Sequence, residues 1–436
     1  MIHNPINEFR TSNDELPKEG SVVLAHTSQL PHQHGTYDAL VLNARSRQSL
    51  VTMRSLGRQG LRIAAMETID AVPIPAFSSR WCHHKTICPT QEGTKEYLTS
   101  LEQVLDSTAA RVLITASDGT VALIRQHREQ LESRIRITLA KEPALAIAVN
   151  KERTLQVAKQ LGVAIPQSVT VGVVSEVGAA VREVGLPAVV KPAESWVQGE
   201  QCRVTCQLVT TLDEARQAVE TLTCFGGRVL FQQFLSGRRE ALNFFYANGQ
   251  MYARFAQWAK RTNPPLGGIS VLRQSIALPL DIGEQAERLV REIELEGYSE
   301  VEFRRDSAGH PYLMEINPRL SASVELAVRA GVDFPYLPYQ WANGDRIDVV
   351  KDYRIGAWMR YLGGDFATTL ASLLQRDRPG VAPPAQAILD FCTSFLVPMS
   401  YDYLDWKDPL PILAAMIGFP RCLLQNRRKR LSKKSP

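Results

Sequence analysis

The sequence predicts an α/β domain with an open, mainly parallel sheet, followed by an α+β domain and a small C-terminal appendage. A chain of 436 residues exceeds what one hydrophobic core usually organises, so two or more domains are expected. Short apolar runs alternate with amphipathic helical patterns up to about residue 145, which is typical of βαβ units. Beyond residue 150 the strand-like runs follow one another as hairpins, which is typical of an α+β domain. The expected divisions are a polar tail over 1–20, the α/β domain over 21–149, the α+β domain over 150–345, the proline-rich appendage over 346–420 and a basic tail over 421–436.

The elements of the first domain alternate between strand and helix. In order, they are expected at residues 39–44, 46–56, 61–66, 111–116, 120–134 and 135–139. No G-x-G-x-x-G motif follows the first strand, so dinucleotide binding is not expected there.

The elements of the second domain begin with a helix over residues 151–161 that ends at Gly162. Strands are expected at 167–174, 188–191, 202–209, 229–235 and 241–246, and helices after the capping box at 211–214 and over 283–296.

The formal net charge of +5 comes from the C-terminal end of the sequence. Residues 421–436 contain seven basic side chains and no acidic one, which leaves 43 basic and 45 acidic side chains elsewhere. Nucleic-acid binding needs basic residues gathered on one surface, so no such partner is expected for the body. Together with the apolar segment 409–420, the basic tail indicates a weak peripheral contact with the anionic inner face of a membrane. The alternative is that the tail is solvated.

The compartment predicted from the sequence is the cytoplasm. The first twenty residues lack the basic and apolar regions of a signal peptide, and the apolar segment 409–420 is too short to span a bilayer. Seven cysteines at irregular spacings do not form a disulfide framework.

The most informative pattern is VEFRRDSAGHPYLMEINPR at residues 301–319. A two-residue Ala-Gly turn between two strands would place Glu302 directly opposite Glu315. Because side chains alternate along a strand, Asn317 would share their face and Met314 would point to the other.

Two carboxylates held face to face are destabilising unless a cation lies between them. Glu302, Glu315 and Asn317 form an all-oxygen set, which suits Mg²⁺ or Mn²⁺ completed by waters and substrate phosphates. The alternative is that both glutamates are solvated residues of a surface hairpin.

The motif MEINPR after VEF, together with AVVKP, VLFQQFLSG and RTNPPLGGISV, resembles the ATP-grasp superfamily over residues 150–320. The group it is most similar to contains carboxylate–amine ligases and predicted carboligases that resemble the carbamoyl-phosphate synthase large subunit. The resemblance implies a pre-ATP-grasp α/β domain, a two-lobed ATP-grasp domain, and ATP with two Mg²⁺ or Mn²⁺ ions as cofactors.

The resemblance also implies the residues that bind nucleotide. Lys151 and Lys191 would neutralise its phosphates, whereas a lone lysine is otherwise most often solvent-exposed. The segment between the lobes would hold the adenine edge with its backbone, and the alternative is an ordinary core strand; its residues are Gln232, Gln233, Phe234 and Leu235. Glu240, one position later than the family's usual glutamate, would bind the ribose hydroxyls.

Two arginines complete the candidate catalytic set. Arg319 would clamp the γ-phosphate or an acyl phosphate, and Arg261 or its neighbour Lys260 would add a second phosphate contact. The alternative for both arginines is a structural salt bridge. The loop over residues 193–200 departs from the family because it has one glycine and two acids, which favour phosphate less than a glycine-rich loop.

The implied reaction activates a small-molecule carboxylate as an acyl phosphate, which an amine attacks to give an amide, ADP and phosphate. Bicarbonate or carbamoyl-phosphate-type carboligase chemistry, an ATP-binding protein without turnover, and a scaffold tethered by the basic tail remain the alternatives.

Three other patterns are interpreted as structural. CHHKTIC at 82–88 has no usual zinc-ligand spacing and is expected to be a loop. Cys202 and Cys206 are expected to be packed thiols. The segment 115–119 is interpreted as the N-cap of the helix over 120–134 rather than as a substrate contact.

Overall fold

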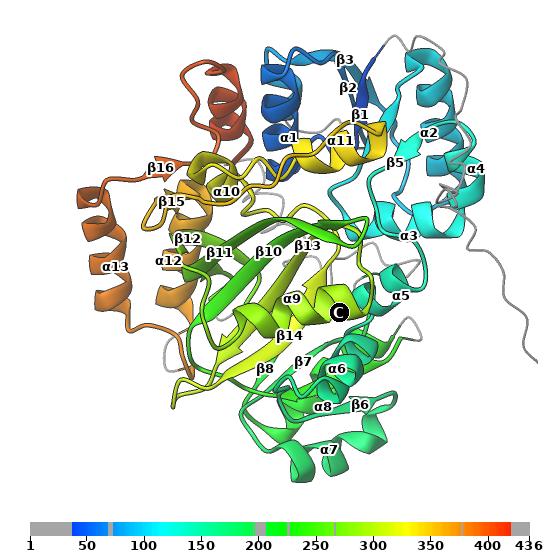
Figure 1. Ribbon diagram of the computed structural model, residues 1–436. Helices are drawn as coiled ribbons and strands as arrows, with labels where there is room; N and C mark the ends of the chain where they lie inside the picture. The colour runs from blue at the N-terminus through cyan, green and yellow to red at the C-terminus, as the bar shows by residue number, and fades with distance from the viewer. Residues whose placement is uncertain are drawn as a thin grey trace, which may run out of the picture. The chain divides into compact units, whose positions relative to one another are not determined.

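Three sheets follow one another along the chain in the computed structural model (Figure 1). The structure describes residues 37–68, 73–194, 196, 206–224, 227–265, 267–375 and 378–419, which all lie in the unit Gly35–Pro436. The predicted tails over 1–20 and 421–436, and most of the loop over 193–200, lie outside the described residues. The predicted α/β and α+β classes are confirmed, and the exact domain divisions stay a prediction.

The first sheet is five-stranded and parallel, in the order β3-β2-β1-β4-β5. Its strands are β1 (Ala39–Val41), β2 (Ile63–Glu67), β3 (Cys82–Ile87), β4 (Val112–Ile114) and β5 (Arg136–Ile137). Its helices are α1 (Arg47–Arg58), η1 (Ala76–Ser78), α2 (Lys95–Thr108), α3 (Asp118–Gln126) and α4 (Arg128–Glu132). Two predictions were wrong here: the segment 82–88 forms edge strand β3 rather than a loop, and the helix over 120–134 is broken at His127.

The second sheet is small and antiparallel, in the order β6-β9-β7-β8. Its strands are β6 (Ser168–Val171), β7 (Ala188–Pro192), β8 (Gln207–Val209) and β9 (Val229–Gln233). The helices in this part of the chain are α5 (Ala144–Val149), α6 (Lys151–Gln160), η2 (Val174–Glu176), α7 (Val177–Val184) and α8 (Leu212–Thr223). As predicted, Thr211 caps α8 by accepting the N–H of Glu214, and the apolar stripe of α8 is buried against the sheet.

The third sheet has seven strands in the order β14-β13-β10-β11-β12-β15-β16. They are β10 (Arg239–Ala247), β11 (Gln250–Asn263), β12 (Ile269–Ile276), β13 (Gly297–Arg305), β14 (Pro311–Asn317), β15 (Trp358–Arg360) and β16 (Ser400–Tyr401). One face of this sheet packs on α9 (Gly283–Glu292) through Leu242, Phe244 and Val301 with Ala286 and Leu289. The opposite face is therefore available for polar side chains. The remaining helices before residue 345 are α10 (Glu325–Ala330) and α11 (Tyr336–Asn343).

The segment expected as an appendage contributes β15 and β16 to this sheet, together with α12 (Leu362–Leu374), α13 (Pro384–Thr393), η3 (Ser394–Leu396) and a last helix over 410–419. Buried ion pairs attach it to the body. Asp402 accepts two hydrogen bonds from Arg273, at 2.8 and 2.9 Å, and one from Arg47 at 3.1 Å. Arg54 of α1 donates to Asp408 at 3.0 Å. The appendage is thus held by charge pairs that are almost fully buried.

Candidate functional site

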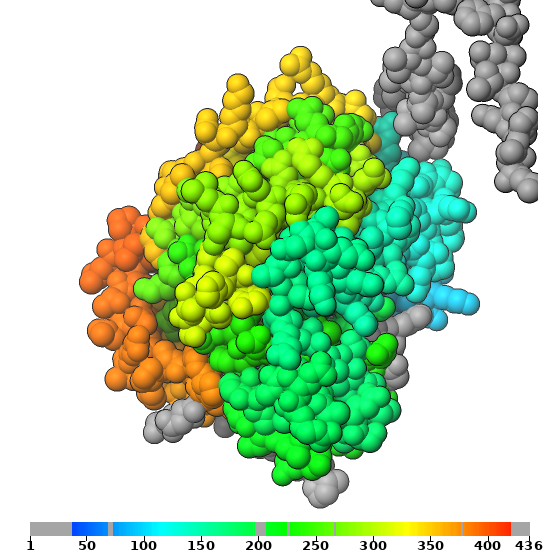
Figure 2. Space-filling model, turned by 60° about the horizontal axis from the view of Figure 1, so that its bottom comes forward, coloured from blue at the N-terminus to red at the C-terminus, as the bar shows by residue number. Residues whose placement is uncertain are grey.

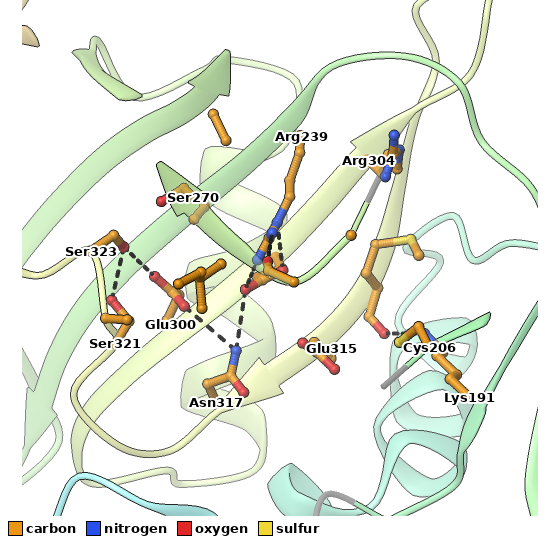
Figure 3. A pocket seen from close by; sticks show the side chains of 18 of the residues that line it. Lys191, Cys206, Arg239, Ser270, Glu300, Arg304, Glu315, Asn317, Ser321 and Ser323 are labelled. Carbon is orange, nitrogen blue, oxygen red and sulfur yellow. Dashed lines mark hydrogen bonds and ion pairs between the residues drawn. The ribbon is translucent and has the colours of Figure 1, made fainter. Parts of the chain in front are cut away.

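A cavity lies between the small sheet and the face of the seven-stranded sheet opposite α9 (Figure 3). From the small sheet and the segment after it, the lining residues are Val189, Lys191, Gln232, Gln233, Phe234 and Leu235. From β10, β11, β13 and β14, the lining residues include Arg239, Gln257, Glu300, Glu302, Met314, Glu315 and Asn317. Gln48 of α1, the loop residues Gly267 and Gly268, and Ile269 and Ser270 at the start of β12 also line the cavity.

The hairpin of β13 and β14 brings the predicted carboxylates together. Glu302 pairs directly with Glu315, and Glu300 pairs with Asn317. The turn differs from the prediction: Asp306 N–H bonds to the carbonyl of His310 at 2.9 Å, so three residues form the loop rather than two. A β-bulge between residues 302 and 303 of the ladder adds one residue on β14 and restores the predicted pairing.

The bulge has a second consequence for Met314. Phe303 pairs with Leu313, and both are buried in the core with Val301. Met314 is the extra residue and lines the cavity, so its predicted position on the core face was wrong. Its carbonyl accepts a hydrogen bond from Lys191 Nζ at 3.4 Å.

Two buried lysines lie beside Glu315. Lys151 Nζ is 3.1 Å from Glu315 Oε2, and Lys151 reaches it from the start of α6, where Asn150 caps the helix. Burial alone would raise the pKa of Glu315, but Lys151 and Lys191 hold it at about 2. For Lys191 the balance is reversed, because burial lowers its pKa more than Glu315 raises it.

Glu302 has a different cation, which the sequence analysis missed. Arg239 donates from Nε to Glu302 Oε2 at 2.9 Å and from Nη2 to Oε1 at 2.6 Å. Asn317 Nδ2 also donates to Oε1 of Glu302, at 3.3 Å. Burial raises the pKa of Glu302 to about 7, against the opposing effect of Arg239.

Arg319 is paired with an acid of the first sheet's helical layer. Its Nε and Nη2 donate to the two carboxylate oxygens of Asp118, at 2.6 and 2.8 Å. Asp118 begins α3, which Ser117 caps by accepting the N–H groups of Gly119 and Thr120. The predicted N-cap is confirmed, and the pair links that cap to the cavity wall.

The segment between the lobes lines the cavity as predicted. Gln233 N–H bonds to the carbonyl of Gln167 at 2.9 Å, which anchors the end of β9. Gln232 is fully buried, and among the described residues neither its amide oxygen nor its amide nitrogen has a hydrogen-bond partner. An unpaired buried amide is costly, so this side chain is a candidate ligand contact.

Glu240 does not lie with the other candidates. Arg239 and Glu240 are adjacent on β10, so their side chains point to opposite faces of the sheet. Glu240 is buried on the face away from the cavity, where Arg305 at 2.8 Å and Arg238 at 3.3 Å pair with it. The expected ribose contact by Glu240 is therefore not supported by its position.

Arg261 is also directed elsewhere. Irregular pairing of β11 with β12 around residues 259–262 turns its side chain toward α12. There it lies 3.0 Å from Asp365 and donates to Thr369 at 2.6 Å. It is not among the residues that line the cavity, so the salt-bridge alternative describes it.

The oxygen donors of the cavity wall fit a hard cation that takes only one or two ligands from the protein. Within the described parts of residues 37–419, no group of three His, Cys, Asp or Glu side chains is placed to hold a metal ion. Glu315 and Asn317 nevertheless offer oxygen donors next to each other on the cavity wall. Mg²⁺ typically takes one or two protein oxygens and completes its octahedron with phosphates and water, so this set is adequate in the presence of a nucleotide.

Several residues that line the cavity were not predicted. They are Glu300, Arg239, Gln257, Ser321 and Ser323, with Asp118 as the partner of Arg319. Strand alternation from Glu302 identifies Glu300, and no comparable signal identifies the others.

Comparison with known proteins bears on the fold. Residues 248–361 match a family described as ATP-grasp in the biosynthetic pathway with Ter operon. A search of curated proteins gives no match to the chain. Biotin carboxylase from Campylobacter jejuni, solved with β,γ-ATP, aligns with a TM-score of 0.59 at 15% identity, over 74% of each chain.

Two further solved structures align similarly. The biotin carboxylase domain of 2-oxoglutarate carboxylase from Hydrogenobacter thermophilus, in complex with MgADP, ADP and bicarbonate, has a TM-score of 0.59 at 15% identity, over 74% of each chain. N5-carboxyaminoimidazole synthetase from Staphylococcus aureus, complexed with ADP, has a TM-score of 0.58 at 15% identity, over 76% of this chain and 83% of that chain.

Proposed function

Because the chain has the ATP-grasp fold, we propose that it is an ATP- and Mg²⁺-dependent ligase. It activates a small-molecule carboxylate as an acyl phosphate, which an amine attacks to give an amide, ADP and phosphate. The observation that carries the proposal is one cavity wall on which Glu302, Glu315 and Asn317 converge beside the ammonium of Lys191.

The roles of the residues follow from their charges. Lys151 and Lys191 bind the phosphates as point charges, and Arg319 clamps the γ-phosphate or the acyl phosphate. Glu315 and Asn317 hold Mg²⁺, which when bound neutralises charge on the phosphates. Arg319 has to exchange part of its pairing with Asp118 for this role.

The reaction then needs positioning more than side-chain chemistry. A carboxylate oxygen of the substrate attacks the γ-phosphorus, and the bond to the β–γ bridging oxygen breaks to release ADP. The amine nitrogen attacks the acyl carbon, the bond to the phosphate oxygen breaks, and the nitrogen loses a proton to phosphate or solvent.

Gln232 supports adenine as the base. Its unpaired amide presents one acceptor and one donor group to the cavity side of β9. Adenine offers a matching N6 donor beside the N7 acceptor, a pairing that glutamine makes in DNA recognition. We therefore add a side-chain contact to the backbone contacts expected from the segment Gln232–Leu235.

Trapping with hydroxylamine tests the proposal. The chain is incubated with ATP, Mg²⁺, hydroxylamine and one carboxylate at a time from a panel of amino acids and sugar acids. One hydroxamate per ADP released is expected with at least one carboxylate, and Glu315→Ala should abolish both products. Hydroxamate formation that survives Glu315→Ala would contradict the metal assignment. ATP binding with no ADP release for any substrate would favour a nucleotide-binding protein without turnover.

Bicarbonate is the second candidate substrate, because the solved structures include a biotin carboxylase domain in complex with bicarbonate and a carboxyaminoimidazole synthetase. In that case ADP release depends on added bicarbonate and no hydroxamate accumulates with organic acids. ADP release measured in carbonate-free buffer, with and without added bicarbonate, distinguishes bicarbonate from an organic carboxylate as the substrate.

A peripheral membrane contact through residues 409–436 also stays a proposal. Leu410, Leu413, Met416 and Ile417 are all more than half exposed, and seven basic residues follow in 421–436. Figure 2 shows α12 and α13, in orange, at one edge of the face in view. The last residue of α12, Leu374, adds a further exposed apolar side chain. No helix in the described parts of the chain is long and apolar enough to cross a membrane. Co-sedimentation with anionic vesicles should be lost on deleting 421–436 while ATP turnover persists.

A further inference from the structure

The guanidinium of Arg239 supplies a cation to Glu302, one of the two facing carboxylates. Both oxygens of Glu302 accept from it, at 2.9 and 2.6 Å, in the two-pronged geometry that arginine makes with carboxylates. Figure 3 shows this side chain reaching down from the strand end to the hairpin. Glu302 is therefore already paired with a cation supplied by the chain itself.

Other contacts fix Arg239 in this position. Its Nη1 donates to the carbonyl of Gly268, so the same guanidinium also holds the loop that lines the cavity. The side chain of Glu302 is 8% exposed and that of Arg239 is 20% exposed, so water replaces neither partner freely. Moving Arg239 away would break both contacts and leave Glu302 buried beside Glu315 without its counter-charge.

Glu315 is held differently. Its partner Lys151 is a point charge at one oxygen, 3.1 Å from Oε2, so the pair lacks the fork geometry by which Arg239 engages both oxygens of Glu302. Asn317 is two residues further along β14 on the same wall. Glu300 faces Asn317 across the hairpin and, among the described residues, accepts hydrogen bonds only from neutral groups. The oxygen donors that remain for a divalent ion are therefore those of Glu315 and Asn317, with Glu300 beside Asn317.

We propose that Arg239 takes the place of one of the two divalent ions, so that the chain binds nucleotide with a single Mg²⁺ or Mn²⁺ on the Glu315 side. The inference rests on the proposed nucleotide site and replaces the two-ion expectation. A guanidinium carries one positive charge where a divalent ion carries two, and it binds oxygen atoms through N–H hydrogen bonds rather than by coordination. The phosphate nearest Glu302 is then bound by the N–H groups of Arg239 and by Lys191 rather than by metal coordination.

Electron paramagnetic resonance of Mn²⁺ tests this count directly. The full chain is titrated with Mn²⁺ at saturating adenylyl-imidodiphosphate, and nucleotide binding is measured in parallel by calorimetry. The wild-type chain should bind one Mn²⁺, with a second binding at least tenfold more weakly. Arg239→Met should bind two, with the broadened spectrum of ions about 3.5–4 Å apart. Arg254→Met is the matched control, because Arg254 makes the same two-pronged pair with Glu287 and does not line the cavity, and it should bind one.

The outcomes separate this inference from the proposed function. Two spin-coupled Mn²⁺ ions in the wild-type chain would overturn the inference while leaving the nucleotide site intact, and this result does not depend on any variant folding. One ion in both the wild type and a folded Arg239→Met would also overturn it, because Arg239 would not be what excludes the second ion. Absence of nucleotide binding in calorimetry would overturn the proposed function as well.

Discussion

Replacing Lys191 by methionine should separate ligand binding from folding stability. Lys191 is 3% exposed, and the hydrogen bond found for its ammonium is the long contact of 3.4 Å to the Met314 carbonyl. Burial lowers its pKa, which means that the folded state disfavours the charged form. Glu315 retains Lys151 at 3.1 Å in the variant, so no buried carboxylate loses its last cation.

The substitution should weaken MgATP binding without lowering the free energy of unfolding. Methionine has similar length and no charge to desolvate, so the free energy of unfolding should stay unchanged or rise by roughly 1–2 kcal/mol. A lost hydrogen bond to a charged group costs about 1.5–3 kcal/mol. MgATP should therefore bind about 10- to 150-fold more weakly.

Thermal unfolding with and without MgATP, with calorimetric binding, measures both quantities. Lys159→Met is the control, because Lys159 is an exposed lysine near the end of α6 and both quantities should stay unchanged. A Lys191→Met chain that is destabilised by more than about 1 kcal/mol yet binds MgATP normally would refute the reasoning, because Lys191 would then serve the fold.

Three further variants or probes test the surrounding structure. Asp402→Asn should destabilise the chain by about 3–5 kcal/mol, measured by denaturant unfolding, because it leaves Arg273 and Arg47 unpaired in the interior. Burial raises the pKa of Asp402, but these arginines lower it by more, so the net shift is downward. Asp402 therefore stabilises the fold fully above about pH 4, and this stabilisation is lost as the pH falls below that value. The free energy of unfolding of Asp402→Asn should lack this decrease at acid pH, and the same decrease in the variant would contradict the prediction. Cys206 was expected to be a packed thiol, but it is exposed and lines the cavity. ATP should therefore slow its alkylation but not that of Cys224 and Cys392, which are exposed outside the cavity, as peptide mass spectrometry can measure. Gly268→Ala should weaken nucleotide binding while Gly267→Ala does not, because a Cβ on Gly268, at φ +68°, would lie 2.3 Å from the Asn263 carbonyl oxygen; equal binding by the two variants would contradict this.

The carboxylate hairpin illustrates how far the sequence alone predicted the site. The pairing of Glu302 with Glu315 was confirmed, although the turn has three residues and a bulge compensates for the extra one. Alternation and turn chemistry predict which side chains share a face, but neither indicates a bulge inside β14. Met314 was therefore assigned to the core and lies in the cavity wall instead.

The other differences come from contacts between distant segments. Arg239, Glu240 and Arg261 are all charged residues near a turn, and their sequence context does not distinguish a cavity side chain from a buried salt bridge. Alternation along β10 places the side chain of Glu240 on the face away from the cavity. Irregular pairing of β11 with β12 turns Arg261 toward Asp365 of α12. Asp118 is 201 residues from Arg319, so only the assembled sheets bring the two together.

Titration of the chain with MgATP, compared between the wild type and Glu315→Ala, tests the central claim most directly. The cavity is a MgATP site only if nucleotide binds there with a metal held by the hairpin. We expect saturable binding to the wild-type chain that weakens when Mg²⁺ is chelated, and a much weaker Mg²⁺ dependence in Glu315→Ala. Binding that is equally tight in both chains, with the same dependence on Mg²⁺, would contradict the account.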